Sequence, residues 1–406
     1  MSIIAAFSLV LVILTIGDIV SAKTKAFVPS VFVAAVLFLF GFWTFLPGDL
    51  ITISGLGMPI AQLGMYLLIT HMGTLMSVRE LAAQWKTITI ALMGIVGICV
   101  GTLTIGRVMF GWETVVTATP PLTGGIVAAI IMSEAAAARG LQNLAVLSIV
   151  MYVMQGFVGY PLTAICLKKE GTRLLNLYRS GAIKIEKKTE EETAATTEAQ
   201  NKFRIFPPLP QKYQTTYMLL AKLGLVAWAS VGFSAVINQM IFSAGGPKDA
   251  ISKYVVCLIF GVIASEIGFL ERRPLNLSGS FGFMMTSLMA FIFAQLAKAT
   301  PEMLGEIALP LVGIIVIGVT GMGVLSIFVG KRFGYSKEMA FSVALTALYG
   351  FPPNYILTEE AANALAETPE EKEYLMDQML PKMLVGGFTT VTIVSVLVAG
   401  IFVGFL

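Results

Sequence analysis

The chain has 406 residues, of which 56% are hydrophobic and 13% are charged, and its mean hydropathy is +0.84. A soluble domain carries about 25% charged residues, so this composition excludes an ordinary soluble enzyme and a disordered chain. The formal net charge of +3 is small and argues against nucleic-acid binding. Long apolar runs recur from end to end, which indicates a polytopic all-α membrane protein.

Ten apolar runs follow one another along the chain, each near or above the roughly 17 residues that a helix needs to cross a bilayer. They are 2–20, 27–46, 57–77, 86–108, 141–166, 214–242, 254–270, 280–298, 304–330 and 380–406. Two further segments, 117–139 and 338–367, are only partly apolar and carry helix breakers and glutamates in their middles. We expect ten transmembrane helices and two re-entrant hairpins.

The positions of the basic residues predict the orientation, because Lys and Arg prefer the cytoplasmic side of a membrane protein. If both partly apolar segments are hairpins and both termini lie outside, the basic residues on the outer face are limited to Arg107, Arg139, Lys248, Lys253 and Lys298. If the first segment crossed the membrane instead, the most basic loop of the chain would lie outside. The pattern therefore favours the hairpins, with a cytoplasmic linker at 167–213 of a protein in the inner (cell) membrane.

This linker divides the chain into an N-terminal repeat, 1–166, and a C-terminal repeat, 214–406, each with five spans and one hairpin. Because five is odd, the two repeats would enter the membrane in opposite orientations, as in many secondary transporters. Short sequence matches support this interpretation. Phe110-Gly111-Trp112 recurs 223 positions later as Phe333-Gly334-Tyr335, and Ser133-Glu134 recurs 225 positions later as Thr358-Glu359. The predicted fold is two inverted repeats of five transmembrane helices.

Each hairpin contains a proline pair and glycine. In the first, Pro120-Pro121 precedes Thr123-Gly124-Gly125, and in the second, Gly350 precedes Pro352-Pro353-Asn354. A proline pair cannot continue a helix, and glycine lets the backbone bend and approach a ligand closely. Unpaired backbone at membrane depth is tolerated where it lines a cavity, and a helix restarting after the glycines would favour an anion at its N-terminus. We expect the two hairpin tips to meet near the midplane and to form the binding site.

Residues beside these breaks are the candidates for binding and coupling. We expect the substrate to contact Thr123, Gly124, Gly125, Arg139, Gly350, Asn354 and Tyr355. Thr346 and Thr358 are candidate sodium ligands, because sodium takes neutral oxygens near broken helices. Glu134 and Glu359 are candidate coupling carboxylates, since a bare carboxylate within a membrane segment is costly. Two alternatives stay open here: both glutamates lie in water at the hairpin ends, or Arg139 pairs with Glu134. The isolated amide Gln155 is interpreted as a contact between helices.

The order of spans and hairpins, with Gly124-Gly125 after the fourth span and a second break after the ninth, resembles the bacterial sodium/glutamate symporters. It resembles the 2-hydroxycarboxylate (citrate) sodium symporters more distantly. In the sodium/glutamate symporters, the first hairpin typically carries Gly-Gly followed by His-Gly and a small residue. In this chain, Gly124-Gly125 is followed by Ile126-Val127-Ala128. The resemblance implies a homodimer that imports a glutamate-like amino acid or a hydroxycarboxylate with sodium, by an elevator movement of the hairpin-bearing parts.

Other functions stay open from the sequence. A proton-coupled carrier would use Glu134 or Glu359, and an exporter or a channel would use the same spans. An enzyme is not expected, because the chain has one histidine and lacks a catalytic dyad or metal motif. A nucleotide-binding Gly-x-x-x-x-Gly-Lys-Ser/Thr motif is absent from the sequence, so transport driven by ATP is not expected. We expect no cofactor, and the resemblance implies sodium as the coupling ion.

Overall fold

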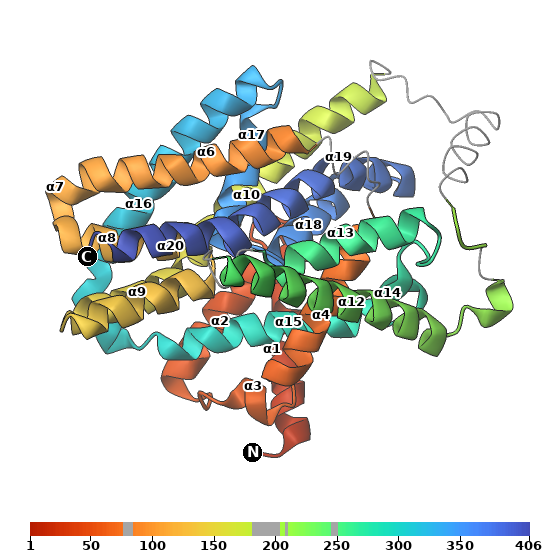
Figure 1. Ribbon diagram of the computed structural model, residues 1–406, viewed down its shortest axis with the longest axis horizontal. Coiled ribbons are helices and arrows are strands. Elements are labelled where there is room, and N and C mark those ends of the chain that lie inside the picture. Colours follow the sequence, from red (N-terminus) through yellow and green to blue (C-terminus); the bar gives the residue numbers. More distant parts are fainter. Residues whose placement is uncertain (76–83, 181–203, 208–209, 245–250) are drawn as a thin grey trace. The chain divides into compact units, whose positions relative to one another are not determined.

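A computed structural model describes residues 1–75, 84–180, 204–207, 210–244 and 251–406 (Figure 1). These residues form helices joined by turns, and none of them lies in a strand, which confirms the prediction of an all-α protein. The middle of the predicted linker, residues 181–203, lies outside the described residues, as does Lys248 of the predicted outer face.

The first half of the chain contains one long series of helices. They are α1 (Ile3–Lys23), α2 (Ser30–Thr44), α3 (Leu50–Ile53), α4 (Met58–Gly73), α6 (Trp85–Gly101), α7 (Arg107–Phe110), α8 (Trp112–Leu122), α9 (Ile126–Ala138) and α10 (Gln142–Arg179). A π-helical segment, η1 (Thr102–Gly106), joins α6 to α7. The helix α10 runs without interruption through the first part of the predicted linker, which is therefore an extension of the preceding span.

The second half contains a second series of helices. Its helices are α12 (Thr216–Ser243), α13 (Lys253–Glu266), α14 (Pro274–Leu277), α15 (Phe281–Ala294), α16 (Pro301–Arg332), α17 (Lys337–Leu345), α18 (Pro353–Leu365), α19 (Pro369–Phe388) and α20 (Ser395–Val403). Short 3₁₀ segments follow α15 and α17, namely η3 (Gln295–Lys298) and η4 (Thr346–Leu348). A π-helical segment, η5 (Thr389–Val394), joins α19 to α20.

Seven helical stretches in the described part of the chain are long and apolar enough to cross a membrane. They are Ile3–Lys23, Trp85–Phe110, Gln142–Arg179, Thr216–Ser243, Phe281–Lys298, Ile307–Arg332 and Pro369–Val403. The predicted spans at 27–46, 57–77 and 254–270 contain the shorter helices α2, α4 and α13, of 15, 16 and 14 residues. Large apolar side chains such as Trp228 and Leu309 are 75% and 77% exposed, as expected where lipid covers the protein. The chain is a membrane protein.

The described helices belong to two compact units. Unit 1 consists of Met1–Gly55, Gln84–Leu175 and Ala290–Leu406, and unit 2 consists of Leu56–Ala83 and Asn176–Met289. Each unit therefore combines segments from both halves of the chain. Both predicted hairpins belong to unit 1.

Within unit 1, α6 packs along α16 through a row of glycines (Figure 1). Gly97 of α6 lies against the carbonyl oxygen of Gly321 in α16, and Gly321 in turn lies against the carbonyl oxygen of Gly97. One turn further, a Cβ at Gly101 would lie 3.1 Å from the carbonyl oxygen of Ile317. Residues without a side chain let two membrane helices approach until their backbones touch, which increases van der Waals contact.

The two hairpins pack on one continuous element at the end of the chain. The helices α8 and α9 contact α20, and α17 and α18 contact α19. In Figure 1, α20 lies alongside α9. Because η5 joins α19 to α20, both hairpins lie against the same long helix.

The prolines do not lie where the sequence reasoning placed the first break. Pro120 and Pro121 belong to the last turn of α8, and the helix continues to Leu122 before the chain turns at Thr123. Each proline lacks the N–H that would donate to the carbonyl oxygen four residues earlier, and its ring crowds that turn, so the helix ends one residue after Pro121. In the second hairpin, Pro353 is instead the first residue of α18, a position where its missing N–H has no helical partner to lose.

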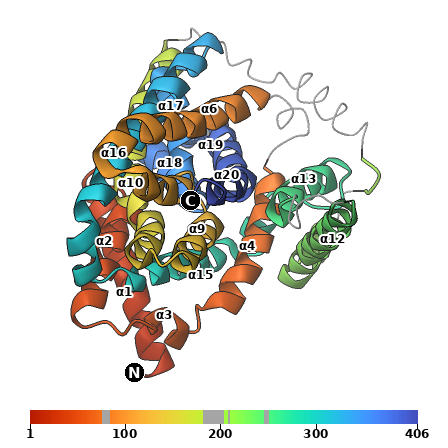
Figure 2. The same ribbon diagram turned by 60° about the vertical axis from the view of Figure 1, so that its left-hand side comes forward.

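Unit 2 is built from α12, α13, α14, α4 and the first part of α15 (Figure 2). Here too glycines bring helices together, because Gly73 of α4 lies against the backbone of α13 and Gly261 of α13 lies against the carbonyl oxygen of Thr70. His71 of α4 accepts a hydrogen bond from the backbone N–H of Leu275 at 3.3 Å, which ties α4 to α14. His71 therefore has a structural role.

Candidate functional site

The first break separates α8 from α9 and consists of Thr123, Gly124 and Gly125. The two glycines have φ angles of 112° and 83°, which residues with a side chain rarely adopt. The helix α9 begins directly after them at Ile126, so its first backbone N–H groups face the break.

The second break separates α17 from α18. After α17 the chain forms the 3₁₀ segment η4, passes Tyr349, and turns at Gly350, whose φ angle is 65°. The backbone N–H of Gly350 donates to the Thr346 carbonyl oxygen at 2.7 Å, which closes this turn. The helix α18 then begins at Pro353.

The structure brings the two breaks together against η5. A Cβ at Gly124 would lie 2.5 Å from the carbonyl oxygen of Ala347 in the second hairpin. A Cβ at Gly125 would lie 2.6 Å from the carbonyl oxygen of Val391 in η5, and one at Gly350 would lie 3.0 Å from the Val391 side chain. Backbone from both hairpins and from the π-helical segment therefore converges on one point, where only glycine fits.

Asn354 lies fully buried in the first turn of α18, beside this convergence. Its side-chain Nδ2 donates to the carbonyl oxygen of Met383 at 3.0 Å, which fixes the orientation of the amide. The other amide atom, Oδ1, is buried and has no hydrogen-bond partner among the described residues. A buried amide oxygen without a partner is an oxygen ligand available to a cation or a donor. Tyr355, the next residue, is only partly buried.

The three threonines near the breaks are fully buried, and their hydroxyl groups have similar partners. Thr123 donates to the carbonyl oxygen of Pro120 at 2.8 Å, Thr346 to that of Val343 at 2.6 Å, and Thr358 to that of Asn354 at 2.6 Å. Each hydroxyl thus donates its hydrogen bond to a backbone carbonyl oxygen, and the lone pairs of the hydroxyl oxygen can still accept a hydrogen bond or bind a cation. Thr346 also lies next to Gly386 of α19, where a Cβ would come within 3.0 Å of its Oγ1.

The charged candidates lie away from the breaks. Glu134 is exposed and comes eight residues after Ile126, or ~12 Å along α9. Arg139 is exposed and donates from both terminal nitrogens to the carbonyl oxygen of Val403 at 3.3 Å. Glu359 forms an ion pair with Lys372 at 3.5 Å, and both side chains are partly exposed. The convergence point is therefore built from backbone and neutral oxygens.

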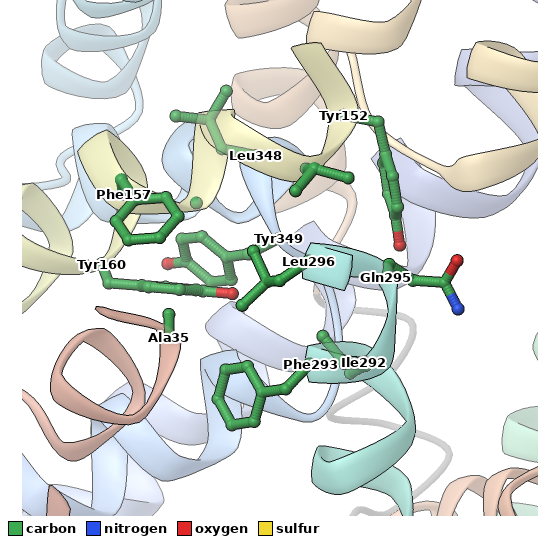
Figure 3. A pocket seen from close by; sticks show the side chains of 12 residues that line it. Ala35, Tyr152, Phe157, Tyr160, Ile292, Phe293, Gln295, Leu296, Leu348 and Tyr349 are labelled. Carbon is green, nitrogen blue, oxygen red and sulfur yellow. The ribbon is translucent and has the colours of Figure 1, made fainter. Parts of the chain in front are cut away.

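A small pocket adjoins the second break (Figure 3). It lies between α10, α2, the end of α15 with η3, and the tip of the second hairpin, and all of its lining residues are uncharged. Tyr160 and Tyr349 lie beside each other, with ring centroids 5.4 Å apart, and the Tyr349 hydroxyl is 2.7 Å from Oγ1 of Thr163. The cavity volume is about 40 Å³, enough for a few water molecules. A solute larger than water needs this region to open.

Sequence reasoning missed two parts of this region. The π-helical segment η5, with Val391 at the meeting point, follows Pro381 and Gly386-Gly387 in the last apolar run, and that run was predicted as one uninterrupted span. Two tyrosines of the pocket, Tyr152 and Tyr160, lie in α10 among other apolar residues, and nothing in the local pattern separates them from residues that face lipid.

The chain was also compared with known proteins. It matches no protein-family model, and no curated protein matches it significantly.

Proposed function

We propose that this protein is a secondary active transporter of the inner membrane that carries a small organic anion together with sodium. The observation that carries the proposal is the convergence of two broken helices, one from each half of the chain, on a buried point lined by backbone and neutral oxygens. Irregular backbone in a membrane protein is tolerated where it is buried or lines a water-filled path, and transporters place their binding sites at such breaks.

The arrangement of helices supports an inverted repeat. The starts of α2 and α13, Ser30 and Lys253, are 223 positions apart, and the starts of α4 and α15, Met58 and Phe281, are also 223 apart. The mutually contacting glycines Gly97 and Gly321 are 224 positions apart. A two-fold axis between two copies brings equivalent residues into contact with each other, so this reciprocal contact fits an axis that passes between α6 and α16.

The chemistry of the breaks supports a charged cargo. The N-terminus of α9 offers partial positive charge to a carboxylate, and the Asn354 Oδ1 with the buried threonine hydroxyls offers oxygens to sodium. Bound together, the anion and the cation would neutralise each other in a region without charged side chains. The resemblance to the sodium/glutamate symporters leads us to propose the same coupling, a homodimer, and an elevator movement of the hairpin-bearing part.

Purified protein in liposomes tests this function. We expect uptake of one member of a panel of labelled glutamate, aspartate, citrate and malate when an inward sodium gradient is present, and none with potassium alone. In detergent, the same compound would raise the melting temperature only in sodium, because a ligand that binds the native state stabilises it. Uptake driven by a proton gradient without sodium would contradict sodium coupling and favour the alternative carrier. Absence of uptake and of stabilisation with every compound would contradict the function.

A further inference from the structure

Gln155 of α10 is a buried amide without hydrogen bonds. The residue is 1% exposed, and neither its Nε2 nor its Oε1 has a hydrogen-bond partner in the described part of the chain. Leaving a buried donor and a buried acceptor unpaired costs free energy, so native proteins rarely keep such a group without a reason.

The side-chain amide of Asn238, by contrast, forms hydrogen bonds through both its nitrogen and its oxygen. Asn238 of α12 donates from Nδ2 to the carbonyl oxygen of Ile251 at 2.8 Å and accepts from the backbone N–H of Ile251 at 2.8 Å. Both ends of that amide are used. Gln155 therefore forms no hydrogen bond that would join helices among the described residues, whereas Asn238 ties α12 to the segment before α13.

The position of Gln155 on its helix places it between the two hairpins. Ser148, seven residues earlier, and Gly159, four residues later, lie on the same face of α10 as Gln155. An α-helix turns by 100° per residue, so residues four or seven positions apart point in similar directions. Ser148 donates to the carbonyl oxygen of Thr117 in the first hairpin at 3.1 Å. A Cβ at Gly159 would lie 2.8 Å from the ring of Tyr349 at the second break. Gly156, beside Gln155, lines the aromatic pocket.

We propose that Gln155 is a direct contact of the transported solute, which satisfies both ends of its amide. This inference rests on the transport function proposed above. The amide offers an NH2 group, which is a donor, and a carbonyl oxygen, which is an acceptor, so it fits a solute that presents a carboxylate next to a donor group, either an ammonium or a hydroxyl. A dicarboxylate without such a donor would leave the Gln155 oxygen unpaired. The solute is therefore an α-substituted carboxylic acid, and Gln155 distinguishes it from its unsubstituted analogue.

The first test measures the protein without solute. We expect Gln155→Met to melt at the same or a higher temperature than the native protein, because the variant removes an unpaired buried amide and keeps a similar volume. Asn238→Leu is the matched control, which we expect to lower the melting temperature because two formed hydrogen bonds are lost. A lower melting temperature of Gln155→Met would show that the amide has partners in the empty protein and would overturn the proposal.

The second test measures discrimination between solutes by competition for sodium-dependent uptake. Native protein should prefer glutamate over glutarate and malate over succinate by roughly tenfold, because the unsubstituted analogue leaves the buried Gln155 oxygen unpaired. Gln155→Met should lose this preference, and Gln155→Asn, whose amide is one methylene shorter, should keep part of it. An unchanged preference in Gln155→Met, with uptake otherwise intact, would overturn the inference and leave the transport function standing.

The third test does not depend on the identity of the solute. In protein whose three native cysteines are replaced by alanine, Gln155→Cys should react with a small water-soluble thiol reagent during cycling, because the solute path reaches this position. Ser148→Cys, on the same helix face but against the first hairpin, should stay unreacted. If Gln155→Cys and Ser148→Cys are equally resistant to the thiol reagent, the proposal is overturned. Labelling of Gln155→Cys in protein that transports no member of the panel would show that a water-filled path reaches this position, whereas the missing transport would contradict the proposed function.

Discussion

Gly124 and Gly125 show how backbone alone shapes the candidate site. Their φ angles of 112° and 83° strain any other residue, and the atom nearest to each Cβ position is a carbonyl oxygen, with the side chains of Val391 and Ser395 next to it. A carbonyl oxygen cannot rotate out of the way without breaking the segment that carries it. The first break therefore tolerates no side chain for two independent reasons.

The structure allows these two reasons to be separated by substitution. We expect Gly124→Ala to reduce uptake at least tenfold, because its Cβ would lie 2.5 Å from the Ala347 carbonyl oxygen and push the hairpins apart. Gly140→Ala is the control, since Gly140 has a φ angle of 78° but nothing within 4 Å of its Cβ position. It carries similar backbone strain without the contact.

The measurement is initial uptake per molecule of protein recovered in the membrane. If Gly124→Ala and Gly140→Ala lose uptake to the same degree, backbone strain alone explains the loss and the contact between the hairpins has no role.

At the level of single residues, the sequence identified the glycines and Asn354 because breakers beside polar residues stand out in an apolar segment. It could not distinguish the neighbouring Glu359 and Glu360, which differ only in the direction they take from α18. Glu359 pairs with Lys372, whereas Glu360 accepts from the backbone N–H of Ser30 at 3.2 Å and so caps α2. Those directions depend on which helices surround α18, and this information is absent from the local sequence.

Among the elements, α6 and α16 pack closely because glycines line both sides of their contact. The sequence predicted both helices from their long apolar runs. It did not predict that they pack on each other, because glycine in an apolar run marks either a bend or a close contact. The first break was placed at the prolines for another reason: a proline pair usually ends a helix, whereas here the helix continues to Leu122.

Substitution of the glycine seam tests this packing. We expect Gly97→Ala to destabilise the protein by about 1–3 kcal/mol, since its Cβ would meet only backbone atoms of α16 and force the helices apart. Gly232→Ala in α12, which meets nothing within 4 Å, should leave the protein as stable or more stable, because alanine favours a helix over glycine. Melting temperatures in detergent measure both effects. Equal values for the two variants would contradict the close packing of α6 on α16.

For the whole molecule, the series of helices could be predicted from hydropathy, but the division into units could not. The chain passes between unit 1 and unit 2 at residues 55–56, 83–84, 175–176 and 289–290. Hydropathy shows where a chain enters a membrane, whereas a compact unit depends on contacts between distant helices. The predicted boundary at the linker therefore separates the repeats in sequence without separating the units in space.

The proposed orientation is testable over the whole chain. In protein without its native cysteines, we expect Gly140→Cys to react with a membrane-impermeant thiol reagent added to intact cells. Thr196→Cys, in the linker, should react only after the membrane is opened, because basic loops stay in the cytoplasm. The reverse pattern would mean that the first hairpin segment crosses the membrane, and it would contradict the orientation with both termini outside.

The contact between α9 and α20 has a consequence for the synthesis of this protein. The helix α9 ends at Ala138, and α20 begins only at Ser395. At the usual rate of about 5–20 residues per second, a ribosome needs roughly 10–50 s to make the residues between them. During this interval lipid or the insertion machinery must cover the face of α9 that α20 later occupies. A nascent chain that stops before its last helix thus leaves the first hairpin without its partner, which gives quality control a signal that the chain is unfinished.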